Sequence, residues 1–273
     1  MIRAARIAIV AVLLAAAQSA HAGERPDPFP RAASSYLLKI DGQAVWERYP
    51  DRRLPPASLT KIMTALLVLE QGRLREVTTV SRAASRETGT KLGLKAGDRV
   101  RVAELLAAAV IGSSNDAARA LAEHVGGTEE AFVRRMNDRA AALGMRDTRF
   151  ANATGHHASG HYSTANDIAV LSEAALADER FARLAATVRL EIKNADGSRS
   201  FTLENRNEMV GRYRGVAGVK SGYTREAGPC LAAWAVRGDR RVLLVLLNAP
   251  NRWWDAVAMM DDAFSLPAPV PSR

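Results

Sequence analysis

The stretch Leu54–Gly72 reads LPPASLTKIMTALLVLEQG. Two prolines close an irregular segment, and the apolar run that follows predicts a helix over residues 62–69 that stops at Gly72. Ser58 and Lys61 stand three residues apart, so their side chains point to the same side of this helix. A serine acts as a nucleophile when a base lies beside it, and lysine is such a base when burial or a second cation lowers its pKa. The pair also fits a helix-capping serine followed by a solvated lysine.

Strand patterns lie toward both ends of the chain, and helix patterns fill its middle. Residues 34–50, 189–205 and 228–250 each predict a hairpin around an Asp-Gly or Gly-Asp turn, and residues 252–266 predict an amphipathic final helix. The helical middle covers about residues 72–180. We therefore predict an α+β fold: an antiparallel sheet built from both chain ends and flanked by helices, with an inserted all-helical lobe and a crevice between the two.

The first 22 residues have the pattern of a secretory signal. Arg3 and Arg6 precede an apolar run, and a small-x-small cleavage site ends at Ala22. We predict cleavage there and export, with an uncleaved anchor as the alternative. The predicted boundaries are a signal peptide at 1–22, a loose N-terminus at 23–32, one folded domain at 33–266 and a loose tail at 267–273.

Composition excludes several classes of protein. The chain has 38 basic and 29 acidic side chains, and cleavage of the signal would leave 36 against 29. The basic residues are scattered without aromatic interleaving, so no nucleic acid is expected as a partner. Cys230 is the only cysteine, which excludes an internal disulfide. His156, His157 and His161 lie in a glycine-rich loop without an acidic partner, so we predict no metal and no cofactor.

Two further polar stretches are candidates for chemistry. Ser113 and Asn115 lie in a break between two helical pieces, where a hydroxyl and an amide can line a crevice; each also fits a helix cap. Lys220, Ser221 and Gly222 follow a short apolar strand. A cation beside a hydroxyl can bind a carboxylate, and an extended peptide can pair with such a strand if it lies at the edge of the sheet. Alone, Lys-Ser-Gly also fits an ordinary turn.

The three motifs, in this order and on these elements, resemble the signature set of penicillin-binding proteins and serine β-lactamases. The resemblance extends over most of residues 33–264 and is to the low-molecular-mass penicillin-binding proteins, the serine-type D-alanyl-D-alanine carboxypeptidases. The stretches that carry it are ASLTKIMTALLVLE, GLKAGDRVRVAELLAAAVIGSSNDAARALAEHVGG, MNDRAAALGMRDTRF, GHYSTANDIAVL and GVKSGYTREAGPCLAAWAVRGDRRVLLVLLNAP.

The resemblance implies a fold like that of DD-peptidases and serine β-lactamases, and a set of catalytic roles. Ser58 would be acylated by a D-Ala-D-Ala stem peptide of peptidoglycan and release the terminal D-alanine, and Lys61 would take the hydroxyl proton. Ser113 and Asn115 would join the proton network and hold the substrate amide. Lys220 would maintain the electrostatics of the site.

The resemblance also implies substrate-binding residues. Ser221 would bind the terminal carboxylate, Gly222 would let the substrate approach, and the N–H groups of Ser58 and Tyr223 would form the oxyanion hole. The segment ENRNEMV is similar to the Arg-Asn segment of the family. Arg206 in this segment is therefore either a further carboxylate contact or a surface arginine.

Some features depart from the family pattern. Serine stands at Ser221 where threonine is commoner, the loop around His156 is rich in histidine, and the chain ends soon after the sheet. We expect a compact periplasmic form without a stable membrane anchor, with β-lactam antibiotics as covalent inhibitors. A DD-endopeptidase that cuts cross-links is the first alternative. A β-lactamase is weakened because residues 150–164 contain no acid, and a non-catalytic β-lactam or wall-binding module stays open.

Overall fold

A computed structural model describes residues 27–267 of the chain. The predicted signal peptide and all but the first residue of the predicted tail lie outside the described residues. The strands are β1 (Ser35–Ile40), β2 (Gln43–Arg48), β3 (Val77–Thr79), β4 (Arg99–Arg101), β5 (Arg189–Lys193), β6 (Ser200–Glu204), β7 (Val216–Thr224), β8 (Gly228–Arg237) and β9 (Arg240–Leu247). The helices are the short 3-10 helix η1 (Ala57–Leu59), α1 (Thr60–Gln71), α2 (Arg82–Ser85), α3 (Val102–Val110), α4 (Asn115–Gly126), α5 (Glu129–Ala142), α6 (Ala165–Leu176), α7 (Glu179–Ala186) and α8 (Arg252–Ser265).

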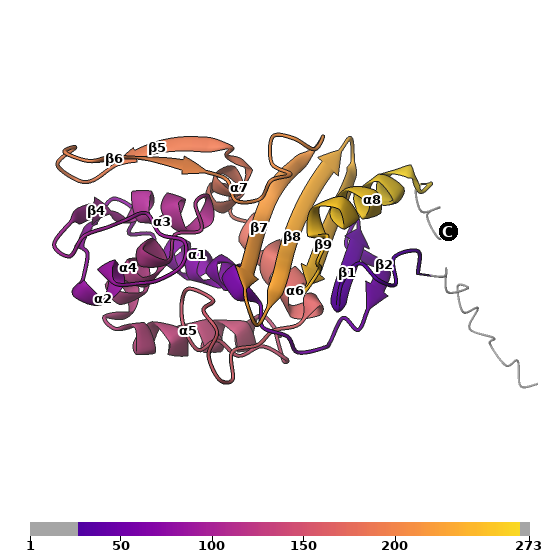
Figure 1. Cartoon of the computed structure of the whole chain (residues 1–273), viewed down its shortest axis with the longest axis horizontal. Coiled ribbons are helices and arrows are strands. Elements are labelled where there is room, and N and C mark those ends of the chain that lie inside the picture. The colour runs from indigo at the N-terminus through magenta and orange to yellow at the C-terminus, as the bar shows by residue number, and fades with distance from the viewer. Residues whose placement is uncertain (1–26, 268–273) are drawn as a thin grey trace, which may run out of the picture.

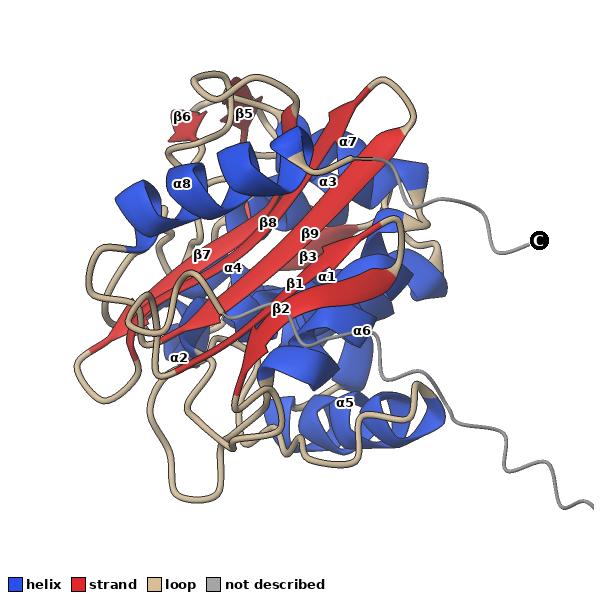
Figure 2. Ribbon diagram, turned by 90° about the vertical axis from the view of Figure 1, so that its right-hand side faces the viewer, coloured by secondary structure: helices blue, strands red, loops and turns tan. Residues whose placement is uncertain are grey.

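Both ends of the chain build the central sheet, as predicted. The order of its antiparallel strands is β2-β1-β9-β8-β7, and the pairing of β1 with β9 places Ser35 opposite Leu247. Figure 2 shows the sheet with α8 across one face and α6 behind the other. Strand β7 ends the order of the sheet, so one of its sides is not paired with another strand.

The strands are apolar on both faces because both faces are covered. In β9, Val242, Leu244 and Leu246 pack toward α8, while Leu243 and Val245 pack toward α6 and α1. A strand buried on two sides reads as a continuous apolar run rather than as an alternation. The run VLLVLL in β9 has this pattern.

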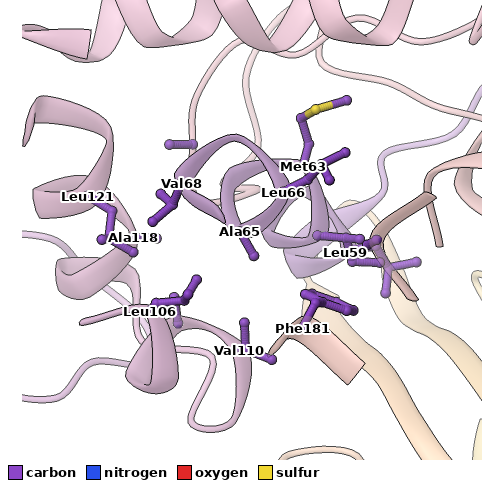
Figure 3. Packing of buried hydrophobic residues seen from close by; sticks show 14 of the residues in the cluster. Leu59, Met63, Ala65, Leu66, Val68, Leu106, Val110, Ala118, Leu121 and Phe181 are labelled. Atoms are coloured by element: carbon purple, nitrogen blue, oxygen red, sulfur yellow. The ribbon is translucent and has the colours of Figure 1, made fainter. Parts of the chain in front are cut away.

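Helix α1 lies at the centre of the hydrophobic core on the side of the sheet opposite α8. All of its residues from Thr60 to Leu69 are buried, so it is surrounded on every side. Figure 3 shows Ala65 and Val68 of this helix facing residues of α3 and α4, with Phe181 of α7 near Leu59. The apolar stretch that opened the sequence analysis is therefore the helix around which the lobe is packed.

The predicted all-helical lobe needs two corrections. Strands β3 and β4 pair inside it as a small sheet, so the lobe is not entirely helical. Helix α6 falls within the predicted range of about 72–180 but packs on the central sheet, against β1, β8 and β9. The helical periodicity that located α6 does not reveal which neighbour its apolar side covers.

The hairpin β5–β6 forms a separate two-stranded sheet beside α3 and β4 (Figure 1). Ala195 at its turn donates to the carbonyl of Arg99 over 2.7 Å, and Arg199 forms an ion pair with Asp98. These contacts attach the hairpin to the lobe. It therefore forms one wall of a cavity beside the lobe.

The predicted loose N-terminus is packed where the structure describes it. The side chain of Asp27 accepts hydrogen bonds from Phe29 N and from the hydroxyl of Tyr36, and the Phe29 ring lies edge-on to Trp46, 5.4 Å between centroids. Aromatic contacts of this kind were not anticipated from the polar, proline-rich sequence. Among residues 27–267, no helix has the length and apolarity needed to cross a bilayer.

Candidate active site

Ser58 and Lys61 meet where η1 passes into α1. The Nζ of Lys61 donates to the Oγ of Ser58 over 3.0 Å. Ala57, immediately before the serine, has a positive φ of 49°, an uncommon backbone conformation for a residue with a side chain. Such backbone strain recurs where a fold fixes a functional group. The structure therefore brings together the first predicted pair.

Lys61 is fully buried and has three acceptors. Besides Ser58, its Nζ donates to Asn115 Oδ1 over 2.6 Å and to the carbonyl of Thr154 over 2.5 Å. Burial lowers the pKa of Lys61 to about 7 from an ordinary 10.5, and the carboxylates of Glu87 and Asp116 partly oppose this shift. An amine with this pKa is partly neutral at neutral pH, as a base beside a hydroxyl must be.

Asn115 begins α4 and its amide orientation is fixed by its neighbours. Lysine Nζ only donates and a carbonyl only accepts. Since Asn115 lies between Lys61 Nζ and the carbonyl of Thr88, 2.7 Å from Nδ2, its Oδ1 must face the lysine. The same Nδ2 lies 3.1 Å from Nε2 of His156.

Ser113 lies in the predicted break between α3 and α4. It is buried and has a φ of 59°, the second strained position of the site. In the described part of the chain, its hydroxyl makes no hydrogen bond with Ser58 or Lys61. The structure thus places Ser113 at the predicted loop without joining it to the lysine network.

The third motif lies on β7, the edge strand of the sheet. Lys220 is buried, and its Nζ donates to the carbonyl of Ser221 over 3.2 Å. Burial, followed by the positive charges of neighbouring cations with Lys61 first, holds the pKa of Lys220 well below its ordinary value. Ser221 Oγ donates to the carbonyl of Arg206 over 2.7 Å.

The backbone of Arg206 links the segment before Ser113 to the strand that carries Lys220 and Ser221. Its N–H donates to the carbonyl of Ile111 over 3.1 Å, and its carbonyl accepts from Ser221. The side chain is exposed and faces a cavity of about 360 Å³ between the lobe and β6, lined also by Thr90, Gly112 and Leu203. Arg206 therefore lies beside the motifs, in a cavity between the lobe and the β5–β6 hairpin rather than in the crevice predicted between the lobe and the central sheet.

Gly222 and Tyr223 complete the third motif. A Cβ built on Gly222 would come within 2.8 Å of Ser58 N, so β7 and η1 are in backbone contact at this point. Tyr223 is 64% exposed, and the role predicted for it uses its backbone N–H. The nine residues predicted for the site thus come from four segments that meet at one end of β7.

Comparison with known proteins decides the family. The model of the D-alanyl-D-alanine carboxypeptidase family, peptidase family S11, matches residues 25–251. This chain belongs to that family. The match confirms the predicted recognition and the class of enzyme, a serine-type DD-peptidase.

Individual members of the D-alanyl-D-alanine carboxypeptidase family agree with the assignment. DacF of Bacillus subtilis is 38% identical over 269 residues, covering 93% of this chain and 68% of the relative. DacC of Escherichia coli is 33% identical and covers 88% of this chain and 62% of the relative. A crystal structure of a D-alanyl-D-alanine carboxypeptidase from Mycobacterium tuberculosis superposes with a TM-score of 0.83 at 29% identity, covering 91% of this chain and 96% of that one. The predicted fold class is confirmed.

Arg252 is a residue of this carboxypeptidase-family site that the sequence analysis missed. It begins α8, and its Nη1 donates to the carbonyl of Gly222 over 2.6 Å. It is partly buried, and burial lowers its pKa from the ordinary value. No motif marks it, because its contact depends on α8 starting beside β7, thirty residues further along the chain from Gly222.

The sequence analysis also missed that the loop from Asn152 to His161 contacts the site. Gly155 has a φ of +87°, and a Cβ there would come within 2.0 Å of the Ala57 carbonyl, so the loop lies directly against η1. The carbonyl of Thr154 in this loop is a partner of Lys61. His161 is buried and bonds to Thr60 Oγ1 over 2.9 Å. Within residues 27–267, no three His, Cys, Asp or Glu side chains gather in a way that could hold a metal ion.

Proposed function

We propose that this enzyme removes the terminal D-alanine from peptidoglycan stem peptides ending in D-Ala-D-Ala, through an acyl-enzyme on Ser58. The observation that carries the proposal is the 3.0 Å contact between Ser58 Oγ and the buried amine of Lys61, whose pKa is lowered to about 7. A neutral amine at this distance can take the serine proton as the oxygen attacks.

Acylation then proceeds as a balanced transfer. Ser58 Oγ attacks the carbonyl carbon of the penultimate D-alanine, and its proton passes to Lys61. The N–H groups of Ser58 and Tyr223 hold the oxyanion of the tetrahedral intermediate. The carbon–nitrogen bond breaks, the terminal D-alanine leaves as the amine with a proton returned from the site, and water later hydrolyses the ester. Ser113 and Asn115 join the hydrogen-bond network around the reacting groups and hold the substrate amide.

The arrangement of charge supports a substrate with a carboxylate at its end. Lys220 is buried beside Ser221, and Arg206 and Arg252 reach the same end of β7. The unpaired side of β7 is suited to an extended peptide that adds as a further strand. Lys220 sets the electrostatics of the site, Ser221 binds the carboxylate, and Arg206 is a second contact for it.

The same chemistry predicts β-lactam antibiotics as covalent inhibitors. A β-lactam presents a strained amide and a carboxylate to the same groups, and its ring opening acylates Ser58. We further propose that the enzyme acts in the periplasm after export. Membership of a family of cell-wall peptidases supports export.

The proposed function is tested by mass spectrometry of the purified protein, exposed to a penicillin and then to a pentapeptide ending in D-Ala-D-Ala. A lasting penicilloyl adduct on Ser58 and loss of one D-alanine from the peptide are expected. Ser58→Ala should give neither, whereas Ser159→Ala, at an exposed serine of the neighbouring loop, should behave as the parent does.

The other outcomes distinguish the alternatives. An adduct without release of D-alanine, together with cleavage of cross-linked dimers, would indicate an endopeptidase. Rapid hydrolysis of penicillin without a lasting adduct would indicate a β-lactamase. An adduct with no cleavage of any peptide would indicate a β-lactam-binding module.

A further inference from the structure

His156 lies against the candidate active site but has no place in the proposed mechanism. Its ring is half-buried, and its Nε2 lies 3.1 Å from Asn115 Nδ2 and 3.3 Å from Glu87 Oε2. The backbone carbonyl of His156 accepts from Asn152 Nδ2 over 2.9 Å, which fixes the loop that carries the ring. One ring nitrogen therefore faces two groups of opposite hydrogen-bonding character.

The amide of Asn115 can only donate toward the ring. Its oxygen is committed to Lys61 Nζ at 2.6 Å, and one amide hydrogen is committed to the carbonyl of Thr88 at 2.7 Å. The second hydrogen points to His156, and Nε2 accepts it only when that nitrogen carries no proton. The neutral ring with its proton on Nδ1 thus completes the hydrogen bonds of Asn115.

The carboxylate of Glu87 requires the opposite state. A carboxylate only accepts, so it bonds to Nε2 only when this nitrogen is protonated. Protonation would turn a hydrogen-bonded contact between Asn115 and His156 into two donors facing each other. The protonation state of the ring therefore decides whether Nε2 accepts from Asn115 or donates to Glu87.

We propose that neutral His156 is a positioning residue that holds the Asn115 amide toward Lys61, and that protonation of His156 releases the amide and transfers the ring to Glu87. This inference rests on the proposed function, because it assigns His156 an effect on acylation of Ser58. Its consequence is a loss of acylation in acid beyond the loss caused by protonation of Lys61 itself.

The charges around the ring come from several elements. Glu87 follows α2, and Arg119 of α4 pairs with this carboxylate over 3.6 Å. Lys61 of α1 and Asp116 of α4 lie behind Asn115, and His157 is the next residue of the loop. Arg119 contacts one oxygen of Glu87, Oε1, and the other oxygen, Oε2, faces the ring of His156.

The test compares acylation by a penicillin across the range from about pH 5.5 to about pH 8.5 in four proteins. His156→Leu removes the acceptor, His156→Gln keeps an acceptor that does not titrate, and His157→Gln changes the exposed neighbour as the matched control. At the alkaline end, His156→Leu should lose about fivefold to tenfold in acylation rate, the effect of one hydrogen bond, and His156→Gln should recover most of this loss.

Acylation rates at low pH isolate the effect of protonating His156. Protonation of Lys61 slows all four proteins alike, so the ratio of each variant to the parent removes its contribution. The rate of His156→Gln relative to the parent should rise as the pH falls, while His157→Gln stays parallel to the parent. A constant ratio for His156→Gln, or equal losses in the Gln and Leu variants, would overturn the proposal.

A second measurement does not depend on catalysis. Long-range ¹H–¹⁵N correlation spectra of the labelled parent should show the His156 ring at alkaline pH as the tautomer protonated on Nδ1. A proton on Nε2 there would overturn the proposal whatever the kinetics show. If the parent forms no adduct on Ser58, the proposed function fails and takes this inference with it. If the parent is acylated and only the ratios or the tautomer disagree, the inference alone fails.

Discussion

Gly222 brings the backbone of β7 into contact with the backbone nitrogen of Ser58. A Cβ at Gly222 would lie 2.8 Å from Ser58 N and 3.0 Å from the Cβ of Ala57. The N–H of Ser58 is one of the two proposed oxyanion donors, so the position of this nitrogen depends on the absence of a side chain in the third motif.

Gly222→Ala should therefore damage acylation more than folding. The added methyl group must push η1 and β7 apart, and a displacement of reacting groups by about 1 Å can cost on the order of 100-fold in rate. We expect a loss of this order in penicillin acylation. The control is Gly197→Ala, a turn position with a φ of +73° where a Cβ meets nothing within 4 Å, so this variant should lose some stability to backbone strain without slowing acylation. An unimpaired Gly222→Ala enzyme would show that the contact does not set the geometry of the site.

The acylation rate should rise with pH and level off above pH 7. Only neutral Lys61 can take the serine proton, and its pKa is lowered to about 7. Below that value, protonation of Lys61 by itself should lower the rate by about tenfold for each pH unit. Stopped-flow measurement of acylation in buffers of matched ionic strength checks this.

Lys61→Ala tests the same assignment directly. It should abolish acylation at neutral pH, whereas Lys95→Ala, at an exposed lysine, should keep the parental profile. Retention of the parental rate by Lys61→Ala would remove this residue as the base.

Asp116 should be a stabilising residue rather than a catalytic one. Its buried carboxylate accepts from the backbone N–H groups of Leu92, Gly93 and Leu94 over 2.8–3.0 Å, and so holds the segment that lines the crevice. Asp116→Asn replaces an acceptor oxygen by a donor and should lower the free energy of unfolding by about 2–3 kcal/mol. Urea denaturation measures this, with exposed Asp138→Asn as the control. Equal stability of the two variants would contradict the assignment.

His161 should make the fold sensitive to acid. Burial, followed by the charge of neighbouring His157, lowers its pKa to about 4 from an ordinary 6.5. The neutral ring accepts from Ala151 N and contacts Thr60. Between these two pH values the unfolded chain binds a proton that the folded chain does not, so the free energy of unfolding falls as the pH drops from 6.5 toward 4. The loss should approach about 3 kcal/mol.

Urea denaturation at a series of pH values tests this dependence. His161→Gln should be less stable at neutral pH but lose less stability in acid than the parent. Ser159→Ala, at an exposed position of the same loop, should keep the parental slope. An unchanged slope in His161→Gln would assign the acid sensitivity to other groups.

Most of the architecture could be predicted from the sequence because the patterns that indicate its helices, strands and turns are local. The Asp-Gly turn at residue 41 located β1 and β2, and the apolar run at residues 62–69 located α1. The break at residues 112–114 separated α3 from α4 as predicted. Each of these features depends on backbone preferences within a few residues, which a single sequence displays.

Contacts between distant segments were beyond the sequence. Strands β3 and β4 are three residues long, too short to show an alternation. Arg252 joins the site because α8, packed on β8 and β9, begins where this side chain can reach the Gly222 carbonyl, and the Thr154 carbonyl is a backbone group that any residue would provide. The motifs located Ser58, Lys61 and Asn115. The contact between His156 and the Asn115 amide could be recognised only in the three-dimensional structure.

The pairing of Ser35 with Leu247 determines when, during synthesis and export, the central sheet can be completed. A polypeptide that emerges from a translocation channel with its N-terminus first delivers β1 and the serine segment long before the strand that must lie beside them. Until β7, β8 and β9 follow, Ser58 has no Gly222 behind it, and the proposed acylation site is incomplete. In an exported chain the topology of the sheet would therefore delay the proposed activity until β9 has crossed the membrane.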